Sequence, residues 1–268
     1  MNAELTGSLG YLQRVIALRY FCLALVRNDL QNRYRRSFLG IAWSLARPIG
    51  MTIVLCTVFT HAFNLALEEY APFLFVSIAL WHFLVESMVA GCNTFKLGAS
   101  YIRQQPIPLL VFPLRTVLGA GVHTSLALGL ALLLIAYFRG LPSLPVLASV
   151  VPGLAVLLLL AVALATLLGI LHTHFPDTQH LLEIALQGLF YLTPVMYRPD
   201  VLADRGRLSD LLACNPFAAV LELIRRPLVA GLYPEPAHCV NALAFLAVVG
   251  GLAWICLRRF ERDLVFWI

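Results

Sequence analysis

Long apolar runs recur along the whole chain and are separated by short polar connections. A membrane-spanning helix needs about 20 mostly apolar residues, and six segments reach or approach that length: 41–63, 71–92, 116–137, 144–171, 181–197 and 239–257. The fourth is long enough to require tilt, whereas the fifth is short and carries Pro194 near its end. The pattern predicts an all-α integral membrane protein with six transmembrane helices.

Residues 20–36, ahead of the first span, mix apolar and basic positions. The apolar positions are Leu23, Val26, Leu30 and Tyr34, and the basic ones are Arg27, Arg33, Arg35 and Arg36. An amphipathic helix in the cytoplasmic interface explains this mixture, with apolar side chains in the acyl boundary and arginines toward the headgroups. A plain positively charged anchor explains it equally well.

The connection between the fifth and sixth spans also contains a helix signal. In Cys214-Asn215-Pro216-Phe217, Asn is a good N-cap and Pro suits the first helical position. Apolar residues then recur at helical spacing, at Phe217, Val220, Leu221, Ile224 and Leu228. We expect short amphipathic or re-entrant helices in this outer loop, with an ordinary extracellular helix as the alternative.

Composition agrees with a location in lipid. Of 268 residues, 60% are hydrophobic and 12% are charged, against about 45–50% and about 25% in soluble domains. We expect one membrane domain over residues 1–268. Its parts are a cytoplasmic or interfacial segment (1–40), spans one to five (41–197), an outer re-entrant loop (198–238), span six (239–257) and a cytoplasmic tail (258–268). The N-terminus lacks the pattern of a cleaved signal peptide.

The charge distribution predicts the orientation. Most of the 19 basic residues lie on one side of the membrane if the N-terminus is inside, so both termini are expected in the cytoplasm. Basic residues clustered at membrane edges favour topology and anionic lipid over nucleic acid as the explanation for the net charge of +5. The six cysteines are scattered without a metal or disulfide pattern, and no bond between Cys214 and Cys239 is predicted.

The sequence contains no motif for nucleotide hydrolysis and no convincing metal-binding motif. A nucleotide-hydrolysing loop ends in Gly-Lys-Ser/Thr, but the only lysine, Lys96, follows Phe95, so any ATP must be handled by a partner. The run from His172 to His180 holds three histidines and Asp177 without the spacing of a zinc site, and a polar turn is the favoured interpretation. We predict no catalytic residue, metal or cofactor bound by this chain.

The predicted spans contain one acidic residue with a nearby histidine and several aromatic residues. Glu86 has His82 one turn earlier on the same face, which suits a proton-coupled carrier, although a helix-packing role is favoured. Aromatic residues gather on three spans: Trp43, Phe59 and Phe63; Trp81 and Phe83; and Phe190, Tyr191 and Tyr197. Aromatic rings stack on sugars, but they also form interfacial belts, and from the residues alone the belt is favoured.

Several sequence blocks carry a family resemblance. The most specific is Arg33-Tyr34-Arg35-Arg36-Ser37-Phe38-Leu39-Gly40-Ile41-Ala42-Trp43-Ser44-Leu45-Ala46-Arg47-Pro48. Others are Asn93, Tyr101-Ile102-Arg103 with Pro106 and Pro108, Phe112-Pro113-Leu114, Tyr191-Leu192-Thr193-Pro194-Val195-Met196-Tyr197, and Asn215-Pro216-Phe217 with Arg225-Arg226-Pro227. Together they span nearly the whole chain, which resembles the membrane subunits of type-2 ABC exporters for O-antigen, capsular polysaccharide and teichoic acid.

The resemblance implies a homodimer of permease subunits in the bacterial inner membrane, bound to two copies of an ATPase subunit that uses ATP and Mg²⁺. Lipid-linked polysaccharide would pass along the dimer interface, with periplasmic or outer-membrane export proteins as further partners. It further implies a gate helix with Arg33, Tyr34, Arg35 and Arg36, and an ATPase-coupling loop with Tyr101, Arg103, Gln104 and Pro106. The substrate path would be lined by Trp43, Phe59, Phe63, Trp81, Phe190, Tyr191 and Tyr197, and residues 211–232 would form a pair of re-entrant helices near the exit.

The expected function is therefore that of a polysaccharide-export permease that is not itself an enzyme. The alternatives are a type-2 ABC permease for lipids or drugs, and an integral-membrane enzyme acting on lipid-linked sugars. Many O-antigen members of the family carry Arg-Asp after span four, where this chain has Phe175-Pro176-Asp177. That segment looks closer to some capsule exporters, so the class of glycan stays open.

Overall fold

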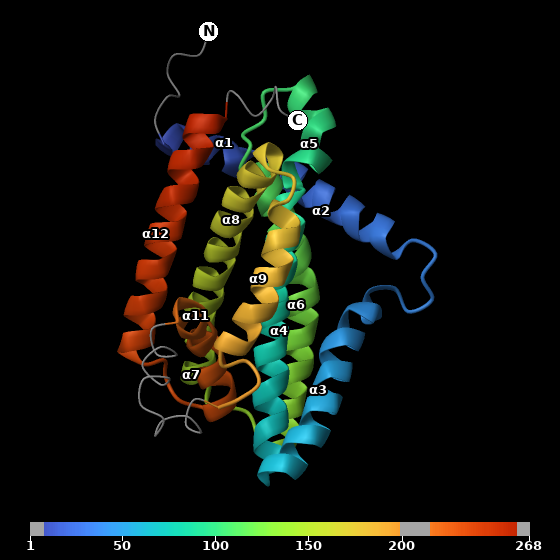
Figure 1. Ribbon diagram of the computed structural model, residues 1–268, viewed down its shortest axis with the longest axis vertical. Coiled ribbons are helices and arrows are strands. Elements are labelled where there is room, and N and C mark those ends of the chain that lie inside the picture. Colours follow the sequence, from blue (N-terminus) through green and yellow to red (C-terminus); the bar gives the residue numbers. More distant parts are fainter. Residues whose placement is uncertain (1–7, 199–214, 262–268) are drawn as a thin grey trace.

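The computed structural model describes residues 8–198 and 215–261, which form helices joined by short connections (Figure 1). The helices are α1 (Ser8–Ala17), α2 (Arg19–Tyr34), α3 (Trp43–Phe63), α4 (Leu67–Cys92), α5 (Thr94–Gln104), α6 (Val111–Phe138), α7 (Leu144–Ala148), α8 (Val150–His174), α9 (Thr178–Leu192), α11 (Pro216–Arg225) and α12 (Pro236–Phe260). A 3₁₀ turn, η1 (Gly40–Ala42), precedes α3, and a π-helical turn, η3 (Arg226–Ala230), follows α11.

Five helical segments of the described residues are long and apolar enough to cross a membrane. They are Gly40–Ala62, Leu67–Cys92, Val111–Phe138, Leu144–His174 and Pro236–Phe260. These segments match five of the six predicted spans. The helices run along the long axis of a bundle, with α1 and α5 at one end and α7 and α11 at the other (Figure 1). We call these the α5 end and the α11 end.

The remaining predicted span, 181–197, is shorter as a helix than the sequence pattern suggested. Helix α9 has 15 residues and ends at Leu192, so it is about 22 Å long, less than the roughly 30 Å of a hydrocarbon core. Pro194 lies just beyond its end and has no N–H to continue the helical ladder. Figure 1 shows α9 running from the α5 end toward the α11 end, alongside α4.

Helix α4 is the central element of the bundle. It packs against α3, α6, α8 and α9, and its buried residues lie on every face, from Tyr70 to Cys92. A helix surrounded by neighbours has no need of a polar face, which explains its near-continuous apolar sequence. By contrast α3 has few buried residues and touches mainly α4, so it is the most loosely attached long helix.

Small residues bring α4 and α8 into close contact. A β-carbon added to Gly91 would lie 2.7 Å from the Ala165 Cα, and one added to Gly169 would lie 2.9 Å from the Gly91 carbonyl oxygen. Small residues at such crossings let helix backbones approach closely in a membrane, where van der Waals packing supplies much of the association energy. The α4–α8 crossing is thus a fixed point of the fold.

A second apolar core lies at the α5 end. It joins α1, α2, α5 and the start of α6 to the ends of α8 and α12, through Tyr11, Val15, Cys22, Phe95, Ile102, Leu109, Val111, Phe112, Ile170 and Leu257. The predicted helix at 20–36 therefore exists as α2, and its first half belongs to this core. Leu23, predicted on the apolar side, is exposed on the surface of the single chain.

The predicted helix after the fifth span is present at the α11 end. The Asn215 side-chain oxygen accepts hydrogen bonds from the backbone N–H groups of Phe217 (2.9 Å) and Ala218 (3.4 Å), and Pro216 occupies the first turn. Gly231, with φ of +65°, ends the π-helical turn. A pair of re-entrant helices was predicted over residues 211–232; within 215–232 the structure has α11 and the π-helical turn η3, and residues 211–214, with Cys214, lie outside the described residues.

Candidate functional site

The end of α2 is joined to two long helices by charged and polar side chains. Arg33 Nη1 donates to Glu86 Oε1 of α4 at 2.5 Å, and the Tyr34 hydroxyl lies 3.0 Å from His123 Nε2 of α6. His123 Nδ1 is also 3.4 Å from Glu86 Oε1. The sequence pattern pointed to His82 as the neighbour of Glu86, but the hydrogen-bonding partners come from α2 and α6. Two of the predicted gate residues, Arg33 and Tyr34, thus belong to one cluster with Glu86 and His123.

The other two predicted gate residues lie in the connection from α2 to α3. Arg35 and Arg36 are exposed, and Arg36 adopts a left-handed conformation with φ of +66°. Gly40, four residues later, has φ of +52°, and its N–H donates to Ser37 Oγ at 3.2 Å. A non-glycine residue at positive φ costs free energy and persists only where the surrounding structure holds it. The sharp turn at Arg36 is therefore imposed by the packing of α2 and α3 on either side of it.

The predicted coupling residues lie on or next to α5, at the tip of the α5 end (Figure 1). Arg103, Gln104 and Pro106 are exposed, whereas Tyr101 is half-buried. The Tyr101 ring packs edge-on against Phe21 of α2, with 5.6 Å between ring centroids. Tyr101 thus connects α5 to α2 through a direct side-chain contact.

The predicted aromatic path residues fall into separate groups. Phe190, Tyr191 and Tyr197 are close together: the first two rings are 5.4 Å apart, and the Tyr197 hydroxyl donates to the Tyr191 carbonyl at 3.2 Å. Trp81 lies behind them in the core, only 4% exposed, with its ring 6.0 Å from Phe190. Its position is that of a supporting residue within one chain.

The aromatic residues of α3 are spread along the helix. Phe59 stacks on Tyr70 of α4 at 6.0 Å between centroids, while Trp43 begins α3 and is 57% exposed. Sixteen residues of helix separate the two by about 24 Å. The side chain of Phe63 lies outside what the structure describes. The α3 aromatics could thus contact different parts of a long ligand but not one small molecule.

The histidine run forms part of a polar junction between α5, α8 and α9. His172 Nε2 lies 3.1 Å from Lys96 Nζ, and Asn93 donates to Gln179 Oε1 at 2.8 Å. Within the described residues, no group of three or more His, Cys, Asp or Glu side chains could hold a metal ion. The junction ties three helices together at the α5 end.

Electrostatics at the α5 end follow from burial and pairing. Burial and the nearby Glu261 carboxylate raise the pKa of Tyr11, whose hydroxyl accepts a hydrogen bond from the Leu110 N–H. Burial also raises the pKa of the Cys22 thiol. For Arg33, burial lowers the pKa, but the hydrogen bond and charge of Glu86 outweigh it and leave the pKa above its usual value. The carboxylate of Glu86 thus favours the charged form of Arg33.

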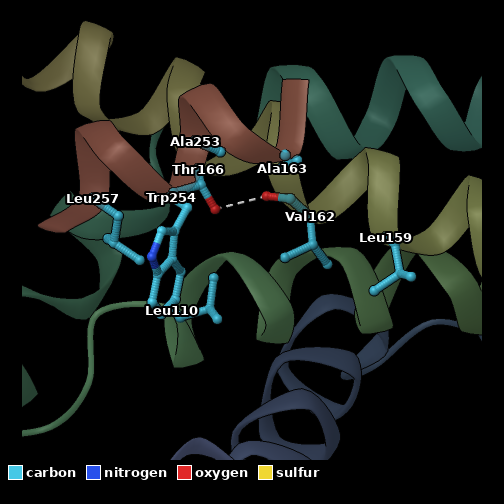
Figure 2. A pocket seen from close by; sticks show the side chains of 9 residues that line it. Leu110, Leu159, Val162, Ala163, Thr166, Ala253, Trp254 and Leu257 are labelled. Carbon is cyan, nitrogen blue, oxygen red and sulfur yellow. Dashed lines mark hydrogen bonds between the residues drawn. The ribbon is translucent and has the colours of Figure 1, made fainter. Parts of the chain in front are cut away.

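A small cavity of about 100 Å³ lies between α6, α8 and α12 (Figure 2). Leu159, Val162, Trp254 and Leu257 are among its lining residues. The one hydroxyl in the lining, on Thr166, donates to the Val162 carbonyl of its own helix at 2.7 Å, as the dashed line in Figure 2 shows. A sugar needs polar partners for its hydroxyls, so this apolar site does not suit one.

Sequence reasoning missed one buried charge, Arg225 of α11. It is 2% exposed, pairs with Glu222, and donates to Ser77 Oγ at 3.0 Å and to the Pro194 carbonyl at 2.6 Å. Its guanidinium also lies 4.4 Å from the centre of the Phe73 ring. Arg225-Arg226 with Glu222 three residues earlier was the available signal, because an i,i+3 pair in an apolar helix indicates a satisfied charge.

Known proteins resemble the chain over most of its length. Residues 20–229 match the family model for the ABC-2 type transporter. The chain is 23% identical over 255 residues to the O-antigen export system permease protein RfbA of Klebsiella pneumoniae, covering 94% of this chain and 95% of that protein. The RfbA protein of Myxococcus xanthus is 27% identical over 243 residues, covering 91% and 92%.

A third relative is the polysialic acid transport protein KpsM of Escherichia coli, 21% identical over 246 residues, which cover 90% of this chain and 93% of that protein. The family match extends from the start of α2 to the turn after α11 and so includes the contacts of Arg33, Tyr101 and Arg225 described above. It confirms the family that the sequence blocks indicated. The chain belongs to the ABC-2 type transporter family of membrane proteins.

Proposed function

We propose that this chain is the permease subunit of an ATP-driven exporter that moves polysaccharide across the bacterial inner membrane. The observation that carries the proposal is the alignment, over at least 90% of the chain, with proteins named for O-antigen export and polysialic acid transport. The permease provides the path and transmits motion, and it is not itself an enzyme. A partner subunit binds and hydrolyses ATP with Mg²⁺.

We infer six membrane crossings, the fifth made by α9 together with the segment that follows it. The course of the chain supports this inference, because α9 leaves the α5 end, where α8 finishes, and α11 lies at the opposite end (Figure 1). The first and last described residues, in α1 and after α12, lie at the same end. Six crossings and the excess of arginine near that end favour both termini, and the α5 end, in the cytoplasm.

The α5 end is the surface we assign to the ATPase. It exposes Arg103, Gln104 and Pro106, and Tyr101 connects this surface to α2 through Phe21. Two permease subunits would bind two ATPase subunits, and closure of the ATPases on ATP would move α5 and α2 as a rigid body.

The glycan path is assigned to the outward faces of α3 and α9 in a homodimer. Tyr191 is 63% exposed, and it is supported from behind by Phe190 and Trp81. Tyr191→Ala should reduce ATPase stimulation by glycan without affecting assembly. Tyr137→Ala is the matched control, because Tyr137 is 84% exposed at the end of α6 and outside the assigned path. Equal loss in both variants would remove Tyr191 from the path.

The connection between α2 and α3 offers a second test. Arg35 and Arg36 are exposed charges and two of the four predicted gate residues, so replacing both with alanine should impair export while the complex still assembles. Normal export by that double variant would contradict a gating role for these arginines.

The decisive experiment is co-purification with the candidate ATPase, followed by ATP hydrolysis in lipid nanodiscs with and without lipid-linked polysaccharide. We expect a stable two-plus-two complex that glycan stimulates. Stimulation by phospholipids or drugs alone would contradict the assigned substrate, and a chain that binds no ATPase would overturn the proposal.

A further inference from the structure

The two halves of α2 are attached to the bundle by different forces. Cys22, Leu25 and Val26, in the first half, are buried, and Cys22 belongs to the apolar core of the α5 end. From Asp29 to Tyr34 no residue is buried, and the second half is held by ion pairs and one hydroxyl–imidazole contact. Apolar packing holds a helix over a broad area, whereas a few partly exposed polar contacts can be broken and remade at low cost.

The two ion pairs of the second half of α2 have opposite polarity: α2 supplies the acidic partner in one pair and the basic partner in the other. Arg115 of α6 contacts Asp29 through two nitrogen atoms, each 2.5 Å from a carboxylate oxygen. One turn later on the same face of α2, Arg33 contacts Glu86 of α4 at 2.5 Å. Asp29 and Arg33 are four residues apart and so lie above one another on the helix surface. The helix therefore presents a negative and then a positive charge to a positive and then a negative partner.

This alternation makes the pairing specific for one axial position of α2. If α2 moved by one turn, about 5.4 Å, either Arg33 would face Arg115 or Asp29 would face Glu86. Both alternatives bring like charges together, which is unfavourable for groups removed from bulk water. The two pairs thus favour a single register of α2 and oppose gradual sliding.

A third contact connects the same point to α6. Glu86 is shared between Arg33 and His123, and His123 is in turn bonded to Tyr34. Beyond Tyr34 the chain turns sharply at Arg36, which has positive φ, and enters the loosely attached α3. The contacts lie just before the connection from α2 to α3, the most loosely attached long helix.

We propose that Asp29, Arg33, Glu86 and Arg115 form a register lock: positioning residues that hold the second half of α2 in the resting state and must separate during each transport cycle. This inference rests on the proposed exporter function for its cycle, but the lock itself is a property of the single chain. In the single chain the Arg33 and Glu86 side chains are 56% and 32% exposed, whereas Arg115 and Asp29 are 13% and 42% exposed, so the Arg33–Glu86 pair is the less buried of the two.

The lock can be tested without any partner by amide hydrogen exchange of residues 27–34 in lipid nanodiscs. Glu86→Gln should accelerate exchange there by about fivefold, the factor that corresponds to about 1 kcal/mol for a partly exposed ion pair. Arg33→Gln should do the same, and the double variant should exchange no faster than either one. Arg27→Gln removes the same charge from an exposed position of α2 and should leave exchange unchanged.

The transport role is tested in the assembled complex with the ATPase. Glu86→Gln and Arg33→Gln should raise basal ATP hydrolysis and lower the ratio of glycan-stimulated to basal rate, and Glu86→Asp should restore the ratio by returning the negative charge. Unchanged exchange in both Gln variants would overturn the lock, as would additive effects in the double variant. A wild-type complex that glycan fails to stimulate would instead contradict the proposed function and leave the exchange result standing. If Glu86→Gln does not fold, Arg33→Gln decides, because its side chain lies at the surface.

Discussion

Two neighbouring arginines of the α11 end, Arg225 and Arg226, each pair with a glutamate but differ in burial. Arg225 is buried and makes an ion pair with Glu222, hydrogen bonds to Ser77 and Pro194, and a cation–π contact with Phe73. It connects α11 to α4 and to the segment after α9. We predict that Arg225→Ala greatly lowers stability.

The magnitude follows from what the substitution leaves behind. Glu222 is only 15% exposed, so without Arg225 it becomes a charge with little access to water. Removing one partner of a buried ion pair typically costs about 3–5 kcal/mol. For a chain of this size that corresponds to a fall in Tm of roughly 6–20 °C. Replacing both residues, as in Arg225→Met with Glu222→Leu, should restore much of the loss because no charge is left buried.

Arg226 provides the matched control, since it follows directly in the chain and also pairs with a glutamate, Glu235. The Arg226 and Glu235 side chains are 29% and 47% exposed, more than those of the Arg225–Glu222 pair, and ion pairs near the surface contribute about 0–1 kcal/mol. Thermal unfolding in nanodiscs, followed by tryptophan fluorescence, compares the variants. Equal Tm values for Arg225→Ala and Arg226→Ala, or a double variant as unstable as Arg225→Ala, would refute the reasoning.

Three further predictions concern helix contacts and pH. Gly91→Ala should lower Tm because its β-carbon would lie 2.7 Å from the backbone of α8, whereas Gly119→Ala, with nothing within 4 Å, should raise it. Asn215→Ala should cost about 1 kcal/mol by removing the N-cap of α11, seen as faster amide exchange in the first helical turn. The hydrogen bond from Arg226 lowers the pKa of Glu235. The pair therefore stabilises the fold at pH values above the ordinary glutamate pKa of about 4.3, and this stabilisation is lost as the pH falls through the lowered pKa. The small Tm difference between wild type and Arg226→Ala should accordingly shrink as pH falls below about 5.

The helices themselves could be predicted because their signals are local. Continuous apolar runs predict spans: α4 contains the predicted segment 71–92, and α7 together with α8 covers the predicted segment 144–171. The start of α11 was predictable because Asn215 and Pro216 each act on the backbone of the next turn. The end of α9 was not, since the apolar pattern continues through Val195 and Met196, whereas the backbone leaves the helix at Leu192.

The partners of the polar residues could not be predicted, because they depend on how helices are arranged in space. Periodicity along α4 places His82 near Glu86, but only the packing of α2 and α6 brings Arg33 and His123 to it. Trp81 is similar: the family resemblance placed it on the substrate path, and the central position of α4 buries its ring within the single chain. Sequence patterns describe one helix at a time, so contacts such as Arg33–Glu86 and His123–Glu86, which join residues 53 and 37 positions apart, become known only from the fold.

The ion pairs at the two ends of the bundle differ in burial, and burial determines how costly each pair is to open. At the α11 end the Arg225–Glu222 pair is removed from water, so opening it would expose an uncompensated charge to an apolar surrounding. At the α5 end the side chains of the Arg33–Glu86 pair are 56% and 32% exposed on the single chain, so opening the contact leaves neither charge enclosed by other helices. A transporter needs one end that keeps its shape and one that can change register under force from a partner. The α11 end suits the first requirement and α2 the second, which is why we place the movable element of this permease at the α5 end.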